Sequence, residues 1–138
     1  MNSYPFLTLK QALFLLRVSV ALVFFLHAVV RVANGTIEQF AEFLSSKGIG
    51  YGTPVVWCIT GYEILGSIVL AFGYFIKILS AGFILILLVG VVLIHASLGW
   101  FVGEHGTGGS EYSFILIIAL VVIAAGTTKQ NSDTGKDD

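Results

Sequence analysis

Charged residues are scarce in this sequence, and their scarcity excludes an ordinary soluble domain. Asp, Glu, Lys and Arg make up 11% of the 138 residues, whereas a soluble domain contains about 25%. The mean hydropathy is correspondingly high, at +0.95. The composition therefore predicts an integral protein of the cell membrane, surrounded by the lipid bilayer and without a nucleic-acid partner.

Cysteine is almost absent, which removes one class of redox chemistry. Cys58 is the single cysteine, so this chain alone can form neither an intramolecular disulfide nor a Cys-x-x-Cys pair. Lysine is missing from the glycine-rich stretch 99–111. The glycine spacing there also matches neither the phosphate-binding loop nor the dinucleotide-binding pattern, so a phosphate-cradling loop is not expected.

Four long apolar segments account for most of the chain. They cover about residues 11–33, 53–75, 78–100 and 112–128, and a helix needs about 20 apolar residues to cross the hydrocarbon core. We therefore predict an all-α protein, a four-helix transmembrane bundle that forms a single domain over residues 1–128. Residues 129–138 are polar and lack apolar periodicity, which predicts a disordered tail.

The connection between the first two apolar segments has a helical pattern of its own. Ile37, Phe40, Ala41 and Leu44 follow the i, i+3, i+4, i+7 spacing of one helix face. Thr36 suits the position before the first turn, and a group of glycines ends the pattern. We expect a short interfacial helix between helices 1 and 2, lying in the plane of the membrane surface.

Glu63 is the most unusual residue, because it lies near the middle of an apolar segment that has no other charge. A charge at the bilayer centre costs about 2.5–3.5 kcal/mol on insertion scales, so an intramembrane ionisable residue is a candidate functional residue. Helix geometry puts several other ionisable residues in the outer half of the same bundle. They are His27, Arg31, His95 and Glu111.

We predict that these side chains form one polar pocket on the non-cytoplasmic side of the bundle. The candidate catalytic residues are Glu63, His27 and His95, which we expect to face the bundle interior because lipid offers them no partner. The candidate substrate-binding residues are Arg17, Arg31 and Glu111. Two alternatives stay open. Arg17 either extends to its own membrane interface or pairs with Glu63, and Arg31 either lines the pocket or anchors the helix end.

Three cofactor hypotheses use the same residues. His27 and His95 could serve as axial haem ligands, and with Glu63 they could hold a transition metal ion. Two histidines are not a signature of either, and we predict no metal site. A quinone could enter the bundle from the lipid, where His27 or Glu63 would bind its carbonyl groups or transfer protons. The cofactor stays open, with a quinone favoured over haem or a metal ion.

The order of these residues resembles the DoxX-like family of small four-helix membrane proteins. The resemblance covers about residues 13–126 and is carried by scattered single positions rather than by one continuous motif. These positions are Leu15-Leu16-Arg17, His27, Arg31, Phe40, Leu44, Gly48, Glu63, Gly66, His95 and Glu111-Tyr112. The chain departs from the family pattern at Ala28, where a glycine often follows the histidine, at Arg31 in place of the more usual lysine, and at Ser113, which takes a common proline position.

The resemblance implies a function in membrane redox chemistry. The family is related to the membrane subunit of thiosulfate:quinone oxidoreductase, which implies a subunit or accessory of a quinone-linked, sulfur-related redox system. The alternative is a non-enzymatic protein, either a conduit for small solutes or a membrane assembly factor, and whether the chain is an enzyme stays open. Gly61, Gly66, Ser67 and Ala71 suit close helix packing within the bundle, in a homo-oligomer or against a partner protein.

The distribution of basic residues predicts the orientation in the membrane. With four crossings both termini share one side, which carries Lys10, Arg17, Lys77, Lys129 and Lys136, while the other side carries Arg31 and Lys47. Because basic loop residues favour the cytoplasm, reporter fusions at residue 77 and after residue 129 should report a cytoplasmic location. Fusions near residues 47 and 104 should report the opposite. A non-cytoplasmic report at both residue 77 and the C-terminus would reverse the orientation.

Overall fold

The computed structural model is all-α over the residues that it describes, which are 6–93 and 110–134, with side chains described as far as residue 127. The helices are α1 (Leu9–Ala33), α2 (Ile37–Ser46), α3 (Gly52–Phe72), α4 (Ile76–Leu93) and α5 (Glu111–Thr134). The all-α prediction is thereby confirmed for these ranges. His95 and nearly all of the glycine-rich stretch 99–111 lie outside them.

Local sequence explains where several helices begin and end. α1 begins with a capping box, in which the Gln11 backbone N–H donates to the Thr8 hydroxyl (3.3 Å) and the Thr8 backbone N–H donates to the Gln11 side chain (2.9 Å). α2 begins after Thr36, as predicted, but the Thr36 hydroxyl donates to the Arg31 carbonyl (3.2 Å) instead of capping α2. α3 ends at Phe72 and is capped by Gly73, whose φ of 89° is readily adopted by glycine.

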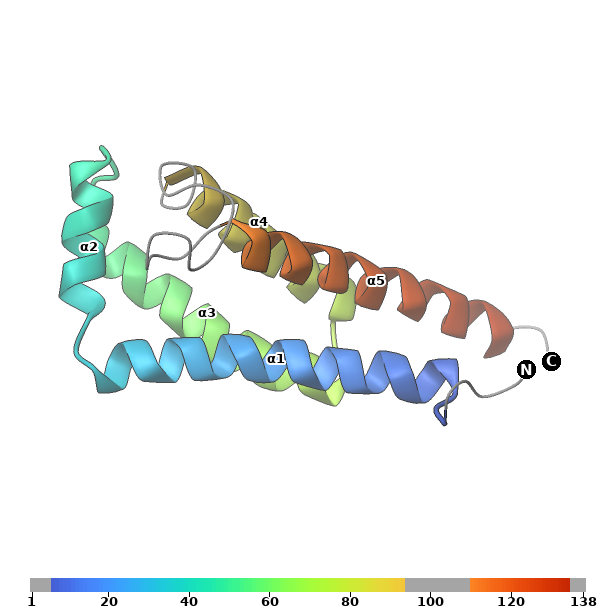
Figure 1. The fold of residues 1–138 in the computed structure, drawn as a ribbon. Coiled ribbons are helices and arrows are strands. Elements are labelled where there is room, and N and C mark those ends of the chain that lie inside the picture. Colours follow the sequence, from blue (N-terminus) through green and yellow to red (C-terminus); the bar gives the residue numbers. More distant parts are fainter. Residues whose placement is uncertain (1–5, 94–109, 135–138) are drawn as a thin grey trace.

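The long helices pack as two antiparallel pairs. α1 lies along α3 and α4 lies along α5, with further contacts from α1 to α5 and from α3 to α4 (Figure 1). α2 crosses one end of this arrangement and packs on α3. The beginning of α1 and the end of α5 lie together at the opposite end. The two ends of the helical domain therefore differ in the described part of the chain, where one end carries a cross-helix and the other does not.

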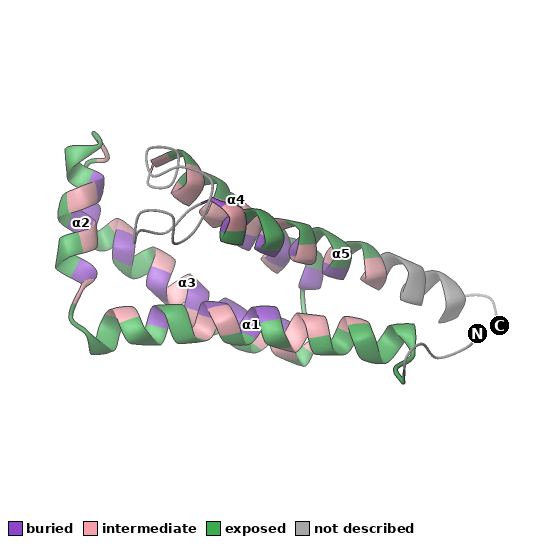
Figure 2. Ribbon diagram, viewed as in Figure 1, coloured by how far each residue is buried: buried purple, intermediate pink, exposed green. Residues whose placement is uncertain are grey.

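All four long helices contribute buried residues to one apolar core, and the buried positions are the purple parts of the ribbon in Figure 2. Phe24 of α1 stacks on Phe83 of α4 with the ring centroids 4.2 Å apart. Leu70 of α3 and Leu120 of α5 are buried in the same cluster. Within a bilayer, such packing stabilises through van der Waals contact, because lipid is as apolar as the side chains themselves.

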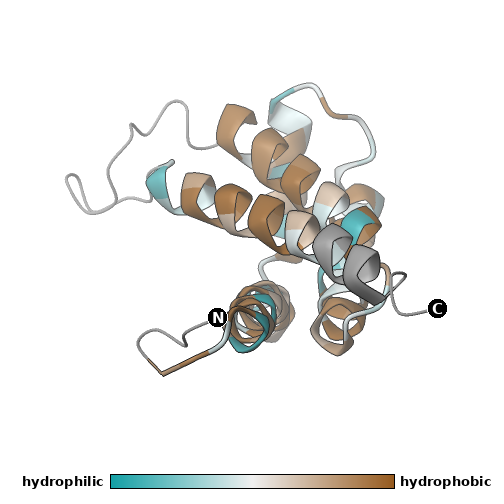
Figure 3. Ribbon diagram, turned by 90° about the vertical axis from the view of Figure 1, so that its right-hand side faces the viewer, coloured by the Kyte–Doolittle hydropathy of each residue, from teal (hydrophilic) through white to brown (hydrophobic). Residues whose placement is uncertain are grey.

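The outer surface of the long helices is also apolar (Figure 3). Leu65, Ile78 and Val92 are 68%, 72% and 71% exposed. α1, α3 and α4 are long and apolar enough to cross a membrane, whereas the apolar part of α5, Glu111–Thr127, is shorter. The first three predicted crossings thus have matching helices. The crossing by α5, and with it the four-helix transmembrane bundle, stays a prediction.

α5 extends further than its composition indicates. Residues 129–134, which we expected in a disordered tail, continue the helix to Thr134, and residues 135–138 lie outside the described ranges. Lysine and glutamine at residues 129 and 130 are good helix formers. Extending an existing helix adds a backbone hydrogen bond per residue without the cost of nucleation, which explains why the helix continues past the apolar stretch.

The predicted short helix between the first two crossings is confirmed as α2. Ile37, Ala41 and Leu44 are buried in one cluster with Val56 of α3, so the apolar face identified by spacing is turned towards α3. The Thr53 hydroxyl donates to the Glu38 carboxylate (3.1 Å) at the edge of this contact. α2 therefore covers one end of the helical domain, and its position in the membrane interface stays a prediction.

The close approach of α2 and α3 at Gly52 predicts an effect on stability. A Cβ at residue 52 would collide with the Ala41 backbone carbonyl and lie 2.8 Å from the Ser45 hydroxyl. Gly52→Ala should therefore lower the free energy of unfolding by about 1–3 kcal/mol, as overpacking does. The measurement is the thermal unfolding midpoint of purified protein in detergent.

Gly61→Ala is the matched control for this substitution. A Cβ at residue 61 of α3 meets nothing within 4 Å, and alanine in a helix interior is more stable than glycine by about 0.5–1 kcal/mol. The control should therefore keep or raise the midpoint. Equal midpoints for Gly52→Ala and Gly61→Ala would contradict the close contact between α2 and α3.

Candidate functional site

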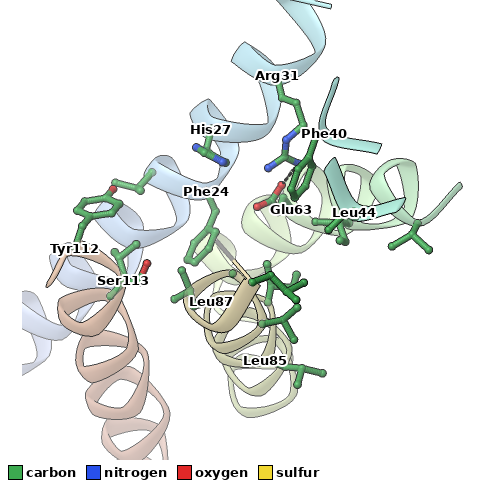
Figure 4. A pocket seen from close by; sticks show the side chains of 18 of the residues that line it. Phe24, His27, Arg31, Phe40, Leu44, Glu63, Leu85, Leu87, Tyr112 and Ser113 are labelled. Atoms are coloured by element: carbon green, nitrogen blue, oxygen red, sulfur yellow. Dashed lines mark hydrogen bonds and ion pairs between the residues drawn. The ribbon is translucent and has the colours of Figure 1, made fainter. Parts of the chain in front are cut away.

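An apolar pocket of about 400 Å³ lies between the helices at the end that α2 covers (Figure 4). All five helices contribute apolar side chains to its lining. Among them are Val23 and Phe24 of α1, Phe40 and Leu44 of α2, Val55 and Ile59 of α3, Leu85, Leu87 and Leu93 of α4, and Leu116 of α5. Its volume lies within the range of small-molecule sites, about 300–1,000 Å³.

Polar groups occupy a small part of this lining. His27 and Arg31 come from the last two turns of α1, and Glu63 comes from the middle of α3 (Figure 4). Tyr112 and Ser113, in the first turn of α5, also line the pocket. A mostly apolar cavity with a few convergent polar groups is the usual form of a ligand site.

The Arg31 and Glu63 side chains form a buried ion pair at the pocket wall. Arg31 Nη1 donates to Glu63 Oε2 at 2.6 Å and to Thr60 Oγ1 at 2.9 Å. The two charged side chains are only 10% and 3% exposed. The guanidinium carbon also lies 5.2 Å from the centroid of the Phe40 ring, a cation–π distance. One side chain thus joins α1 to both α2 and α3.

The stagger of the helices explains why Arg31 is the partner of Glu63. Arg31 is two residues from the end of α1, whereas Glu63 lies about 16 Å along α3 from its beginning at Gly52. The first turns of α3 pack on α2 rather than on α1, as the cluster of Val56 with Leu44 shows. The end of α1 therefore lies level with the middle of α3, and Arg31 reaches Thr60 and Glu63 together.

Arg17 lies away from this pocket. Its guanidinium packs against Gly73 at the end of α3, with nitrogen atoms 3.1–3.2 Å from where a Cβ of residue 73 would stand, and it lies 5.5 Å from the Phe14 ring centroid. The structure does not bring Arg17 to Glu63, the pairing considered above. Arg31 takes that place, so it does more than anchor the end of α1.

The remaining predicted residues are placed as follows. Glu63 faces the interior, as expected. His27 lines the pocket one helical turn before Arg31, on the same face of α1, and it is an exposed side chain. Glu111 is the first residue of α5 and precedes the pocket residue Tyr112. His95 lies outside the described residues, so its role stays a prediction.

Sequence reasoning missed three site residues, which are Thr60, Phe40 and Ser113. Thr60 lies three residues before Glu63 and therefore on the same face of α3, a spacing that could have identified it once Glu63 was suspected. Phe40 was identified as an apolar position of the short helix and as one of the positions of the family resemblance, but not as a neighbour of Arg31, whose guanidinium it contacts. No local pattern distinguishes a pocket-lining Ser113 from any other serine in an apolar segment.

The metal hypothesis needs His95 together with His27 and Glu63, and His95 lies outside the described residues, so this hypothesis is not tested. Among the residues that the structure describes, no three His, Cys, Asp or Glu side chains come together in a way that could hold a metal ion. The haem hypothesis needs His95 as well as His27, and it is not tested. Cys58 lies exposed on α3 and is not among the residues that line the pocket.

The apolar helices, their apolar outer surface and the buried ion pair define an integral membrane protein of helical class. The family model described as DoxX matches residues 12–96, which is more than half of the chain. The chain belongs to the DoxX family. No curated protein and no solved structure matches it.

The buried ion pair predicts that losing one partner is worse than losing both. Arg31→Gln and Glu63→Gln should each lower the free energy of unfolding by about 3–5 kcal/mol, because each leaves the opposite charge buried and unpaired. The double variant Arg31→Gln/Glu63→Gln should recover part of that loss. The measurement is the unfolding midpoint of each variant in the same detergent.

Glu42→Gln provides the matched control, since Glu42 is an exposed carboxylate on α2. A surface substitution of this kind should change the free energy of unfolding by no more than about 0.5 kcal/mol. If the double variant lost the sum of the two single losses in free energy of unfolding, the two charges would not depend on each other. The same conclusion would follow if each single variant lost no more than the control.

Proposed function

We propose that the pocket binds a quinone and that the protein is a subunit or accessory of a quinone-linked membrane redox system. One observation carries this proposal. The cavity is mostly apolar, and its lining includes a cluster of three polar side chains, those of His27, Arg31 and Glu63. A quinone has the complementary chemistry, because its ring and tail are apolar and its two carbonyl oxygens accept hydrogen bonds. Sites of this composition bury the apolar body of a ligand and orient it through a few polar contacts.

Access from the lipid supports the same ligand. Leu85 and Val89 of α4 line the pocket and are nevertheless 62% and 44% exposed. The pocket therefore borders the apolar outer surface of the protein. A quinone dissolved in the bilayer would reach it sideways, between α4 and its neighbours, without passing through water.

The polar residues have separate roles in this proposal. Arg31 uses Nη1 for Glu63 and Thr60, and a guanidinium has five N–H donors, so others are left for a quinone carbonyl. Glu63 holds that guanidinium in place. His27 lines the pocket as an exposed side chain, which suits it to pass a proton between the ligand and water.

The reaction needs a partner as the source of electrons. Reduction of a quinone to a quinol takes up two electrons and two protons. On this chain His27 is the candidate for this proton transfer, because Glu63 is paired with Arg31. The resemblance to the membrane subunit of a thiosulfate-oxidising enzyme implies that the electrons come from a reduced sulfur compound, oxidised by a partner subunit.

Orientation in the membrane follows from the basic residues. We propose that α5 makes a fourth crossing and that both termini are cytoplasmic, which is supported by five basic residues on that side against two on the other. The pocket would then lie in the half of the bundle nearer the non-cytoplasmic surface, below α2. Protons for quinone reduction would reach His27 from that side.

The proposal predicts that filling the pocket displaces the quinone. Gly90 of α4 lines the pocket, and a Cβ at this residue meets nothing within 4 Å, so Gly90→Leu should place an apolar side chain in the cavity without a clash. We expect quinone extracted from gently solubilised protein to fall about tenfold, which corresponds to about 1.4 kcal/mol of binding free energy. Gly61→Leu is the matched control, because residue 61 is equally open but does not line the pocket.

Other outcomes of the same experiment would identify the alternatives. Absence of quinone from the wild-type protein, combined with solute flux in liposomes, would favour a conduit. Absence of quinone with a stably co-purifying membrane protein would favour an assembly factor. Equal quinone content in Gly90→Leu and Gly61→Leu would show that the ligand occupies some other place. The absorbance spectrum and the metal content of the same sample would test for haem and metal ions.

A further inference from the structure

A second, smaller cavity lies at the opposite end of α1 from the quinone pocket. Its volume is about 180 Å³, and it is formed by the first turns of α1 and by α5. The lining consists of Lys10, Leu13, Phe14 and Arg17 of α1 with Ile123, Gly126 and Thr127 of α5. Arg17 and Arg31 are roughly 21 Å apart along the helix axis, so this cavity is separate from the first.

The cavity contains a cation without a matching anion. Arg17 Nε is buried and has no hydrogen-bond partner among the described residues. Its guanidinium contacts Gly73 and the Phe14 ring instead. No carboxylate is among the described side chains that line the cavity. An unpaired buried donor is costly, so the site favours a partner that the described residues do not supply.

The polar groups of the cavity suit a phosphate. Lys10 and Arg17 are seven residues apart and therefore lie on one face of α1, about 10 Å from each other along the axis. The Thr127 hydroxyl donates to the Ile123 carbonyl (3.1 Å), which leaves its oxygen free only to accept. The hydrogen-bond donors available to a ligand therefore come from Lys10 and Arg17. Two cations with several N–H groups favour a ligand that has several acceptor oxygens.

We propose that this cavity binds a phosphate-bearing anion, held between Lys10 and Arg17. The headgroup of an anionic phospholipid and free inorganic phosphate share this chemistry. Lys10 lies near the beginning of α1. With the crossings and orientation proposed above, this position is close to the lipid headgroups, and Arg17 can extend towards it from below. Basic pockets between transmembrane helices on the cytoplasmic side bind anionic headgroups in this way. Phe14, which is 57% exposed beside the cavity, offers an apolar surface for an acyl chain.

The test compares two lipids of opposite headgroup charge. The full-length protein, purified in a neutral detergent, is incubated with phosphatidylglycerol or phosphatidylcholine, and retained lipid is counted by native mass spectrometry. We expect phosphatidylglycerol to be retained preferentially, and the preference to fall about tenfold in Arg17→Gln, since a hydrogen bond to a charged group is lost. Lys10→Gln should also weaken it. Because Lys10 is exposed, Lys10→Gln should keep the fold. If Arg17→Gln does not fold, the lipid preference of Lys10→Gln tests the site.

Lys77→Gln is the matched control, because Lys77 is an exposed cation in the first turn of α4, at the same end of the domain, and it does not line the cavity. It should retain the lipid as the wild-type protein does. Equal losses in Lys77→Gln and Lys10→Gln would indicate general charge attraction and overturn the site, as would the absence of any preference for the anionic lipid. Displacement of phosphatidylglycerol by excess inorganic phosphate would identify free phosphate as a ligand, and resistance to displacement would identify the lipid.

Discussion

The ion pair between Arg31 and Glu63 determines how the helices around the larger apolar pocket are arranged. A carboxylate in the middle of an apolar helix needs a cation at its own depth, and Arg31 can supply one only if the end of α1 lies level with the middle of α3. The first turns of α3 then extend beyond α1. α2 covers them, with Leu44 packed on Val56, so the position of the cross-helix follows from the position of one pair of charges.

The two arginines of α1 illustrate two ways of accommodating a cation in an apolar helix. Arg31 is neutralised by a carboxylate and receives further contacts from Thr60 and Phe40. Arg17 lies instead against Gly73 at the C-terminal end of α3, where the helix dipole supplies partial negative charge. The first arrangement is complete within the chain. The second leaves a buried N–H group without a partner among the residues that the structure describes, which is why the two ends of α1 border such different cavities.

The sequence was sufficient for those features that depend on composition or on spacing along one helix. The apolar segments predicted α1, α3 and α4, the apolar positions from Ile37 to Leu44 predicted α2, and the isolation of Glu63 predicted a buried partner. The identity of that partner depends on how far one helix is shifted against another. Depth counted along straight helices ignores this shift, which is why the sequence suggested Arg17 as the cation for Glu63, whereas the structure pairs Glu63 with Arg31. The continuation of α5 to Thr134 was missed because apolar composition marks the part of a helix suited to lipid and not its end.

The ion pair also bears on how the protein enters the membrane during synthesis. Arg31 and Glu63 are separated by 32 residues, so α1 is complete before the residue that neutralises its arginine has been made. Insertion of α3 alone would carry an uncompensated carboxylate into lipid, at about 2.5–3.5 kcal/mol. If α1 and α3 insert together, as a hairpin connected by α2, the ion pair between Arg31 and Glu63 is already formed when it enters the membrane. The segment from α1 to α3 is therefore suited to be the first unit that the membrane accepts, with α4 and α5 added to it afterwards.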